Sequence, residues 1–142
     1  MSILIDSNIL VFAINQDSHK HEAAQIFLQT HSAQLIVAHQ NILESFRVLT
    51  HPKFSTPMTA ADALEALNNI ISVALVITPN AKTYAVWQEL MQKYAVKSDA
   101  IFDCYLAATA LSAGVMTIAT DNTKDFQKYE EIKILNPFQS VK

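Results

Sequence analysis

Five short apolar runs recur along the chain, and longer stretches with a helical spacing of apolar residues separate them. The runs cover residues 3–5, 34–39, 72–77, 115–120 and 132–135. They are brief and partly β-branched, which is typical of strands buried on both faces of a parallel sheet. The pattern therefore predicts five buried strands.

Helical patterns lie between these runs, at residues 18–31, 40–51, 59–71, 80–94 and 98–113. Ser18 and Thr59 are candidate N-caps, and Thr59 and Asp62 have the spacing of a capping box. Gly114 lies directly after the last predicted helix, where glycine is favoured. Strands that alternate with helices predict an α/β fold with a parallel sheet. Apolar residues share one face of the third predicted helix, and this face could pack in the core or form an interface with another chain. They are Ala60, Ala63, Leu64, Leu67, Ile70 and Ile71.

Composition narrows the class of protein further. A chain of 142 residues suits one domain, residues 1–142, and a net charge of −3 provides no overall basic field for nucleic acid. The single cysteine, Cys104, excludes an internal disulfide and favours a reducing compartment. No apolar stretch approaches the length needed to span a membrane, so we expect a cytoplasmic protein. Gly114 is the only glycine, which excludes glycine-rich phosphate loops.

Acidic residues follow two of the predicted strands. Asp6 lies between two apolar runs, and an ionised carboxylate buried there costs several kcal/mol unless it is paired. It therefore either caps a helix or binds a cation. Asp121 follows the strand at 115–120, and ligands of open α/β sheets gather at the carboxyl ends of strands. We expect both carboxylates at the same edge.

Two further acids lie within predicted helices. Glu44 has a simple structural interpretation as a surface residue that pairs with Arg47 three positions later. Asp103 follows Asp99 by one helical turn, so two like charges face each other near the start of the helix. The helix dipole accounts for Asp99 better than for Asp103, whereas a divalent cation bound by oxygen ligands would remove the repulsion.

The histidines do not indicate a zinc site or a catalytic triad. His19 and His21 would diverge on a helix, and we interpret them as surface residues. Cys104 has no second cysteine or histidine at zinc-like spacing.

Four segments together resemble the acidic motifs of the PIN domain family, in particular its VapC-type toxins. They are LIDSNILV, NILESFRVLTHP, IFDCYLAATALSAGV and IATDNTKDF, and the closing LNPF also resembles the tail of such proteins. The resemblance covers essentially the whole chain. It implies a three-layer α/β/α domain with a central parallel sheet and a metal-dependent ribonuclease activity.

The resemblance also implies a set of site residues. Its four acids would be Asp6, Glu44, Asp103 and Asp121, with Asp125 as the alternative for the fourth. These acids would bind Mg²⁺ or Mn²⁺, and Asp6 and Asp103 would be its direct ligands. The small polar residues beside them would hold a carboxylate or a metal-bound water by hydrogen bonds; these are Ser7, Asn8, Thr120 and Asn122.

The resemblance implies three partners: an RNA substrate, an antitoxin protein and a second copy of the chain. It implies no association with a membrane. Among the basic residues, Arg47 and Lys124 are candidates for RNA binding, although most surface lysines are simply solvated. Two other functions remain open. One is a Mg²⁺-dependent phosphatase, which fits poorly because the first motif is D-S-N and not D-x-D. The other is a PIN-like module that has lost catalysis and binds proteins only.

Overall fold

The structure, a computed structural model, describes residues 1–139 and 141. Six α-helices, one 3-10 helix and five strands follow one another in the described chain. Their bounds are β1 Ile3–Ile5, α1 Ser7–Ile14, α2 His21–Thr30, β2 Leu35–Ala38, α3 His39–Thr50, α4 Ala60–Ile71, β3 Leu75–Ile77, α5 Thr83–Lys93, α6 Ala100–Ser112, β4 Thr117–Ala119, η1 Thr123–Asp125 and β5 Lys133–Leu135.

The strands form one parallel sheet in the order β3-β2-β1-β4-β5. The first strand is central, with Leu4 opposite Ile36 of β2 and Ile118 of β4. Because all strands run the same way, their carboxyl ends lie along one edge. The ends of β1 and β4 are adjacent there, which places the residues that follow these two strands side by side.

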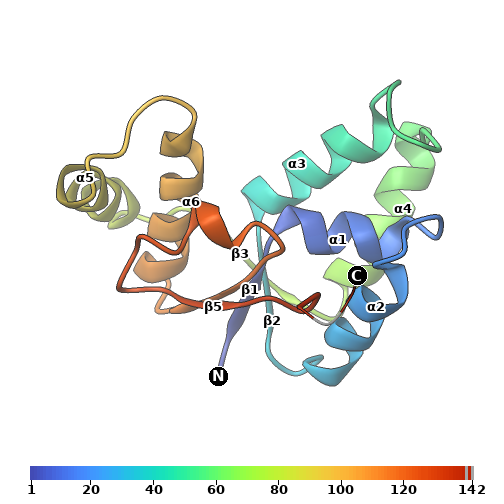
Figure 1. The fold of residues 1–142 in the computed structure, drawn as a ribbon, viewed down its shortest axis with the longest axis horizontal. Helices are drawn as coiled ribbons and strands as arrows, with labels where there is room; N and C mark the ends of the chain where they lie inside the picture. Colours follow the sequence, from blue (N-terminus) through green and yellow to red (C-terminus); the bar gives the residue numbers. More distant parts are fainter. Residues whose placement is uncertain (140, 142) are drawn as a thin grey trace.

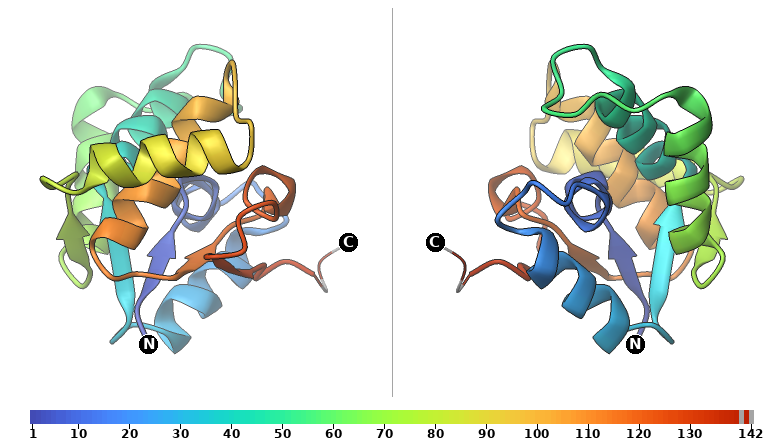
Figure 2. Two further views of the ribbon diagram at one scale, coloured as in Figure 1. Left: turned by 90° about the vertical axis from the view of Figure 1, so that its left-hand side faces the viewer. Right: turned by 90° about the vertical axis from the view of Figure 1, so that its right-hand side faces the viewer.

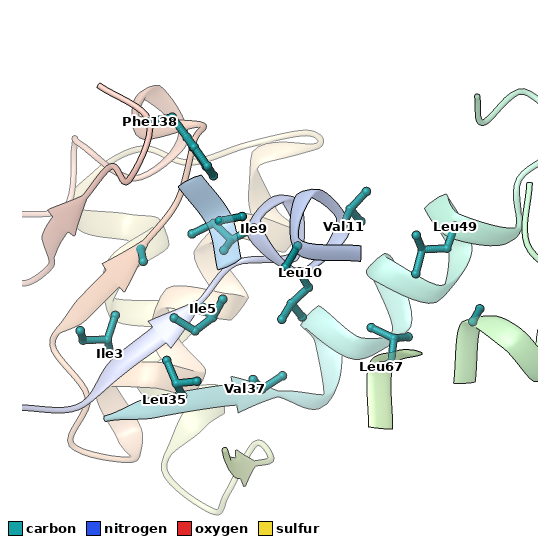
Figure 3. Packing of buried hydrophobic residues seen from close by; sticks show 14 residues of the cluster. Ile3, Ile5, Ile9, Leu10, Val11, Leu35, Val37, Leu49, Leu67 and Phe138 are labelled. Carbon is teal, nitrogen blue, oxygen red and sulfur yellow. The ribbon is translucent and has the colours of Figure 1, made fainter. Parts of the chain in front are cut away.

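Helices cover both faces of the sheet, as Figure 1 shows, with α1 to α4 on one side and α5 and α6 on the other. The two turned views in Figure 2 look onto α5 from one side and onto α2 and α4 from the other. Strand residues alternate between two cores: Ile3 and Ile5 pack with α1 to α4, while Leu4 packs with α5 and α6. Figure 3 shows Ile3 and Ile5 among the side chains of the first core. The predicted three-layer α/β/α architecture is confirmed.

The five strands predicted from the apolar runs are present, each within or at the predicted residues. The prediction that all five are buried is wrong for β3 and β5, which are the edge strands of the sheet and are partly exposed, Leu75 to 64%. The C-terminus of α6 also agrees, since Gly114 follows the helix with a φ of 77°, which glycine adopts without strain. The helix α2 begins later than predicted. Ser18 lies before it, and its hydroxyl accepts a hydrogen bond from the Lys20 amide, so Ser18 is not the N-cap.

The helix α4 combines a predicted cap with a partly buried apolar face. The Thr59 hydroxyl accepts a hydrogen bond from the Asp62 amide at 3.1 Å. Ala63 and Leu67 are buried in the core, whereas Leu64 is 49% exposed. The apolar face of this helix therefore serves mainly the core. None of the helices in the described part of the chain is long and apolar enough to cross a membrane.

Candidate active site

Asp6 follows β1 directly and is 7% exposed. It is the N-cap of α1, and its Oδ1 accepts a hydrogen bond from the Ser7 amide at 2.8 Å. The sequence left a helix cap and a cation site as alternatives, and the cap is present. It does not cancel the cost of burial, because burial still raises the pKa of Asp6 above its usual value. The neighbouring charges of Glu44 and Asp125 raise this pKa further.

A polar network joins the ends of β1 and β4 around this carboxylate. The Thr120 hydroxyl donates to Asp6 Oδ2 at 2.8 Å, and the Asn8 amide donates to Asp6 Oδ2 at 3.3 Å and to Thr120 Oγ1 at 3.1 Å. In return, the Asp121 backbone N–H donates to Asn8 Oδ1 at 3.2 Å, and the Asn122 N–H donates to Thr120 Oγ1 at 3.0 Å. These bonds hold the first carboxylate in one orientation.

Glu44 reaches the same site from α3. Ser7 donates its hydroxyl proton to Glu44 Oε2 at 3.1 Å. Gln40 donates to Glu44 Oε1 at 3.2 Å and to the Phe102 carbonyl oxygen at 3.1 Å, which ties α3 to α6. Sequence reasoning missed Gln40, although its position four residues before Glu44 places both side chains on one helix face.

Asp103 lies in the first turn of α6 and is half-buried. Burial first, and then the charges of Asp125, Asp6 and Glu44, raise its pKa from 3.8 to about 7. Lys128 opposes this effect and lowers the pKa. The negative charges around Asp103 therefore disfavour its ionised form, a condition that a bound cation relieves.

Asp121 and Asp125 have different surroundings. The carboxylate of Asp121 forms an ion pair with Lys20, with 2.6 Å between Nζ and Oδ2. Asp125 lies in η1, and its charge acts on both Asp6 and Asp103. Asp125 is therefore near enough to act on the other acids through its charge, whereas Asp121 has a basic partner, Lys20, just before α2.

The predicted substrate-binding residues are exposed and have no acidic partner among the described residues. Arg47 is exposed in the last turn of α3, and Lys124 is exposed in η1. Within residues 1–139 and 141, the ion pairs are Lys20–Asp121 and Lys93–Glu131, so Glu44 and Arg47 do not form the surface pair that the sequence allowed.

The donor atoms fit a hard divalent cation. Each of the four acids offers carboxylate oxygen, the ligand that Mg²⁺ and Mn²⁺ prefer. Among the described residues, no three acidic, histidine or cysteine side chains converge closely enough to enclose an ion by themselves. An ion here would complete its shell with water, as Mg²⁺ commonly does.

Comparison with known proteins agrees with this geometry. The family model of the PIN domain matches residues 3–132. The chain is similar to Ribonuclease VapC24 of Mycobacterium tuberculosis (strain CDC 1551 / Oshkosh), with 27% identity over 140 residues, covering 96% of this chain and 97% of that protein.

Solved structures share the fold. VapBC2 from Rickettsia felis, bound to a DNA fragment from their promoter, has a TM-score of 0.75 at 18% identity and covers 96% of this chain and 98% of its own. The sarcin-ricin loop cleaving toxin VapC20 of Mycobacterium tuberculosis has a TM-score of 0.67 at 15% identity, with coverages of 92% and 98%. With the family model matching nearly the whole chain, this protein belongs to the PIN domain family.

Proposed function

We propose that this chain is a divalent-metal-dependent endoribonuclease of the VapC type, the toxin of a toxin–antitoxin pair. The observation that carries the proposal is the acidic cluster. Carboxylates from the end of β1, from α3, from α6 and from η1 lie close enough to raise the pKa of Asp6 and Asp103. The similarity to a VapC ribonuclease along the whole chain supports the choice of RNA as substrate.

Each acid has a role that follows from its contacts. Asp6, which a capping amide and the Thr120 hydroxyl hold in place, and Asp103 would bind Mg²⁺ or Mn²⁺ directly. Glu44, oriented by Ser7 and Gln40, would bind through water and orient the attacking water molecule. The bound ion supplies a water of lowered pKa and neutralises charge on the phosphate. Attack of water on the phosphodiester would leave a 5′-phosphate and a 3′-hydroxyl.

For the fourth acid, Asp121 was the first choice from sequence and Asp125 the alternative. The contacts favour Asp125, because Lys20 already neutralises Asp121. Calorimetric titration with Mn²⁺ separates the two. Asp125→Asn should weaken binding by about tenfold or more, while Asp121→Asn should leave the affinity for Mn²⁺ nearly unchanged. If Asp121→Asn weakens Mn²⁺ binding more than Asp125→Asn does, Asp121 is the fourth acid.

The activity is tested with purified protein and total RNA, with Mg²⁺ or Mn²⁺ or with EDTA, beside an Asp103→Asn control. Discrete fragments that require metal and disappear in the control would support the nuclease. Hydrolysis of a phosphomonoester without RNA cleavage would support the phosphatase instead. Metal binding with no hydrolysis of either substrate would support a non-catalytic PIN-like module.

The partners belong to the same proposal. A structural neighbour of this chain is a VapBC2 assembly, which supports an antitoxin as partner. A homodimer stays a prediction; Leu43 and Phe102, which are 70% and 62% exposed on α3 and α6, are apolar surface that a second copy could cover. Cys104 is a buried free thiol, in keeping with a protein that acts in the cytoplasm.

A further inference from the structure

Two adjoining cavities form a groove that leads away from the acidic cluster. The first, of about 370 Å³, lies beside the site and has polar lining residues Ser7, Asn8, Asn15 and Asn122. The second, of about 220 Å³, is lined by Arg47, His51 and Lys53. Val48 and Phe54 line both cavities, so the two form one continuous surface, which we call the Phe54 groove.

The inner end of the Phe54 groove is connected to the proposed catalytic residues. Ser7 lines the groove and donates its hydroxyl proton to Glu44 Oε2 at 3.1 Å. Asn8 lines it as well and donates to Asp6 Oδ2. A chain lying in the groove would therefore run directly to the carboxylates.

The outer end of the groove is a turn that local hydrogen bonds hold in shape. After α3 ends, the Lys53 backbone N–H donates to His51 Nδ1 at 3.0 Å, and the Phe54 N–H donates to the His51 carbonyl oxygen at 2.9 Å. The Met58 N–H donates to the Leu49 carbonyl oxygen at 2.9 Å and anchors the loop to α3. Because Nδ1 of His51 is an acceptor, its Nε2 carries the proton and is available as a donor.

The groove is also basic at this end, in a protein whose net charge is −3. Arg47, His51 and Lys53 are exposed, and none forms an ion pair within the described part of the chain. Asp17 lines a third cavity together with Phe54, and the Thr56 hydroxyl donates to its carboxylate at 2.8 Å. The cations at the outer end suit phosphates, and the aromatic ring of Phe54 suits a stacked base. The amides of Asn15 and Asn122, which line the inner cavity, suit base edges, whereas the Asn8 amide is already bonded within the protein.

We propose that the Phe54 groove binds the single-stranded RNA segment next to the cleaved bond, with phosphates on Arg47 and Lys53 and a base stacked on Phe54. This inference rests on the proposed nuclease function. Single-stranded RNA fits because its unpaired base edges are open to the amides of the groove, whereas those of a duplex are paired.

The test is the salt dependence of RNA binding. The affinity for a labelled, unstructured RNA oligonucleotide is measured by fluorescence anisotropy in EDTA, which prevents cleavage, over a range of salt concentrations. For a single strand, each phosphate contact contributes about 0.7 to the slope of log K against log salt. The double variant Arg47→Gln/Lys53→Gln should lower this slope by about 1.4 and weaken binding. The matched control Lys82→Gln/Lys133→Gln removes two exposed cations elsewhere and should leave the slope unchanged.

Phe54 is tested separately, because it also packs against the core. Phe54→Leu keeps an apolar side chain but removes the aromatic face, and it should weaken binding about tenfold with the same salt slope. Phe54→Trp should retain the wild-type affinity. Urea unfolding of each variant verifies that the fold is intact.

The outcomes separate this inference from the nuclease proposal. Binding that depends on Arg47, Lys53 and Phe54, without cleavage when metal is added, would support the groove and contradict the nuclease. The opposite outcome is metal-dependent cleavage in which none of these variants changes the salt slope or the affinity for RNA. This outcome would contradict the proposed groove and support the nuclease. In that case the groove would be free to bind a segment of a protein partner.

Discussion

Replacing Asp103 by asparagine should stabilise the metal-free protein at neutral and higher pH. Burial and three neighbouring carboxylates raise the pKa of Asp103 from 3.8 in an unfolded chain to about 7. A carboxyl group whose pKa is higher in the folded state binds more protons when folded. The free energy of unfolding therefore falls as the pH rises from about 4 to 7, and the loss is complete above pH 7.

The size of the effect follows from this difference in pKa. About three pH units at about 1.4 kcal/mol each give a ceiling of about 4 kcal/mol. Asp103 is only half-buried, so solvent screens the repulsion, and asparagine keeps part of the cost of burial. We expect Asp103→Asn to raise the free energy of unfolding by about 1–2 kcal/mol at pH 8. At pH 5 Asp103 is protonated in the folded protein but already ionised in the unfolded chain, so only about a third of this difference, about 0.5 kcal/mol, should be present.

Urea unfolding in EDTA at pH 5 and pH 8 measures this difference. Asp99→Asn is the matched control, because Asp99 is the N-cap residue of α6, four residues before Asp103, and is outside the set of acids that raise the pKa of Asp103. Addition of Mn²⁺ at pH 8 should reverse the order, because an ion that binds only the folded wild type stabilises it. An Asp103→Asn protein that is less stable than wild type at pH 8 without metal would refute the acidic cluster.

Three further predictions concern the site and the fold. Thr120→Val removes the hydroxyl that lowers the pKa of Asp6, so the pH midpoint of Mn²⁺ binding should rise by about one unit. Calorimetric titrations at several pH values measure this midpoint, and an unchanged midpoint would contradict the role of Thr120. Leu67→Ala should cost about 3 kcal/mol in urea unfolding and Leu64→Ala under about 1 kcal/mol, and equal costs would mean that the helix face is not divided between core and surface. Thr59→Ala should cost about 1 kcal/mol through loss of the α4 cap, measured as a lower urea midpoint with an unchanged slope.

The sequence predicted the positions of the strands well because each is a short apolar run bounded by polar residues, although only β1, β2 and β4 are fully buried. It did not predict α1, the helix directly after Asp6. Ile9, Leu10 and Val11 of this short helix are all buried, so its residues lack the alternation of apolar and polar faces that marks an amphipathic helix. A helix buried on several sides cannot be distinguished from a buried strand by periodicity alone.

Asp6 stood out in the sequence because a carboxylate between two apolar runs conflicts with its surroundings, whereas Glu44 was assigned to the site only through the resemblance to the PIN family. Asp103 stood out because Asp99 comes one turn earlier, but the charges that raise its pKa in the structure are those of Asp125, Asp6 and Glu44 from other elements. The choice between Asp121 and Asp125 was not visible, because both follow β4 within a few residues. It depends on Lys20, which is 101 positions from Asp121 along the chain.

The sequence by itself indicated the type of every main element except α1, the α/β class and the acids that we propose as cation ligands, since periodicity and residue chemistry are properties of short segments. Tertiary structure alone decided the neighbours of each charge. Packing places η1 beside α6, pairs Lys20 with Asp121 and brings the turn after α3 to the Phe54 groove. Electrostatic interactions depend on distance in space, and the distances between these groups are set by how helices pack on the two faces of the sheet.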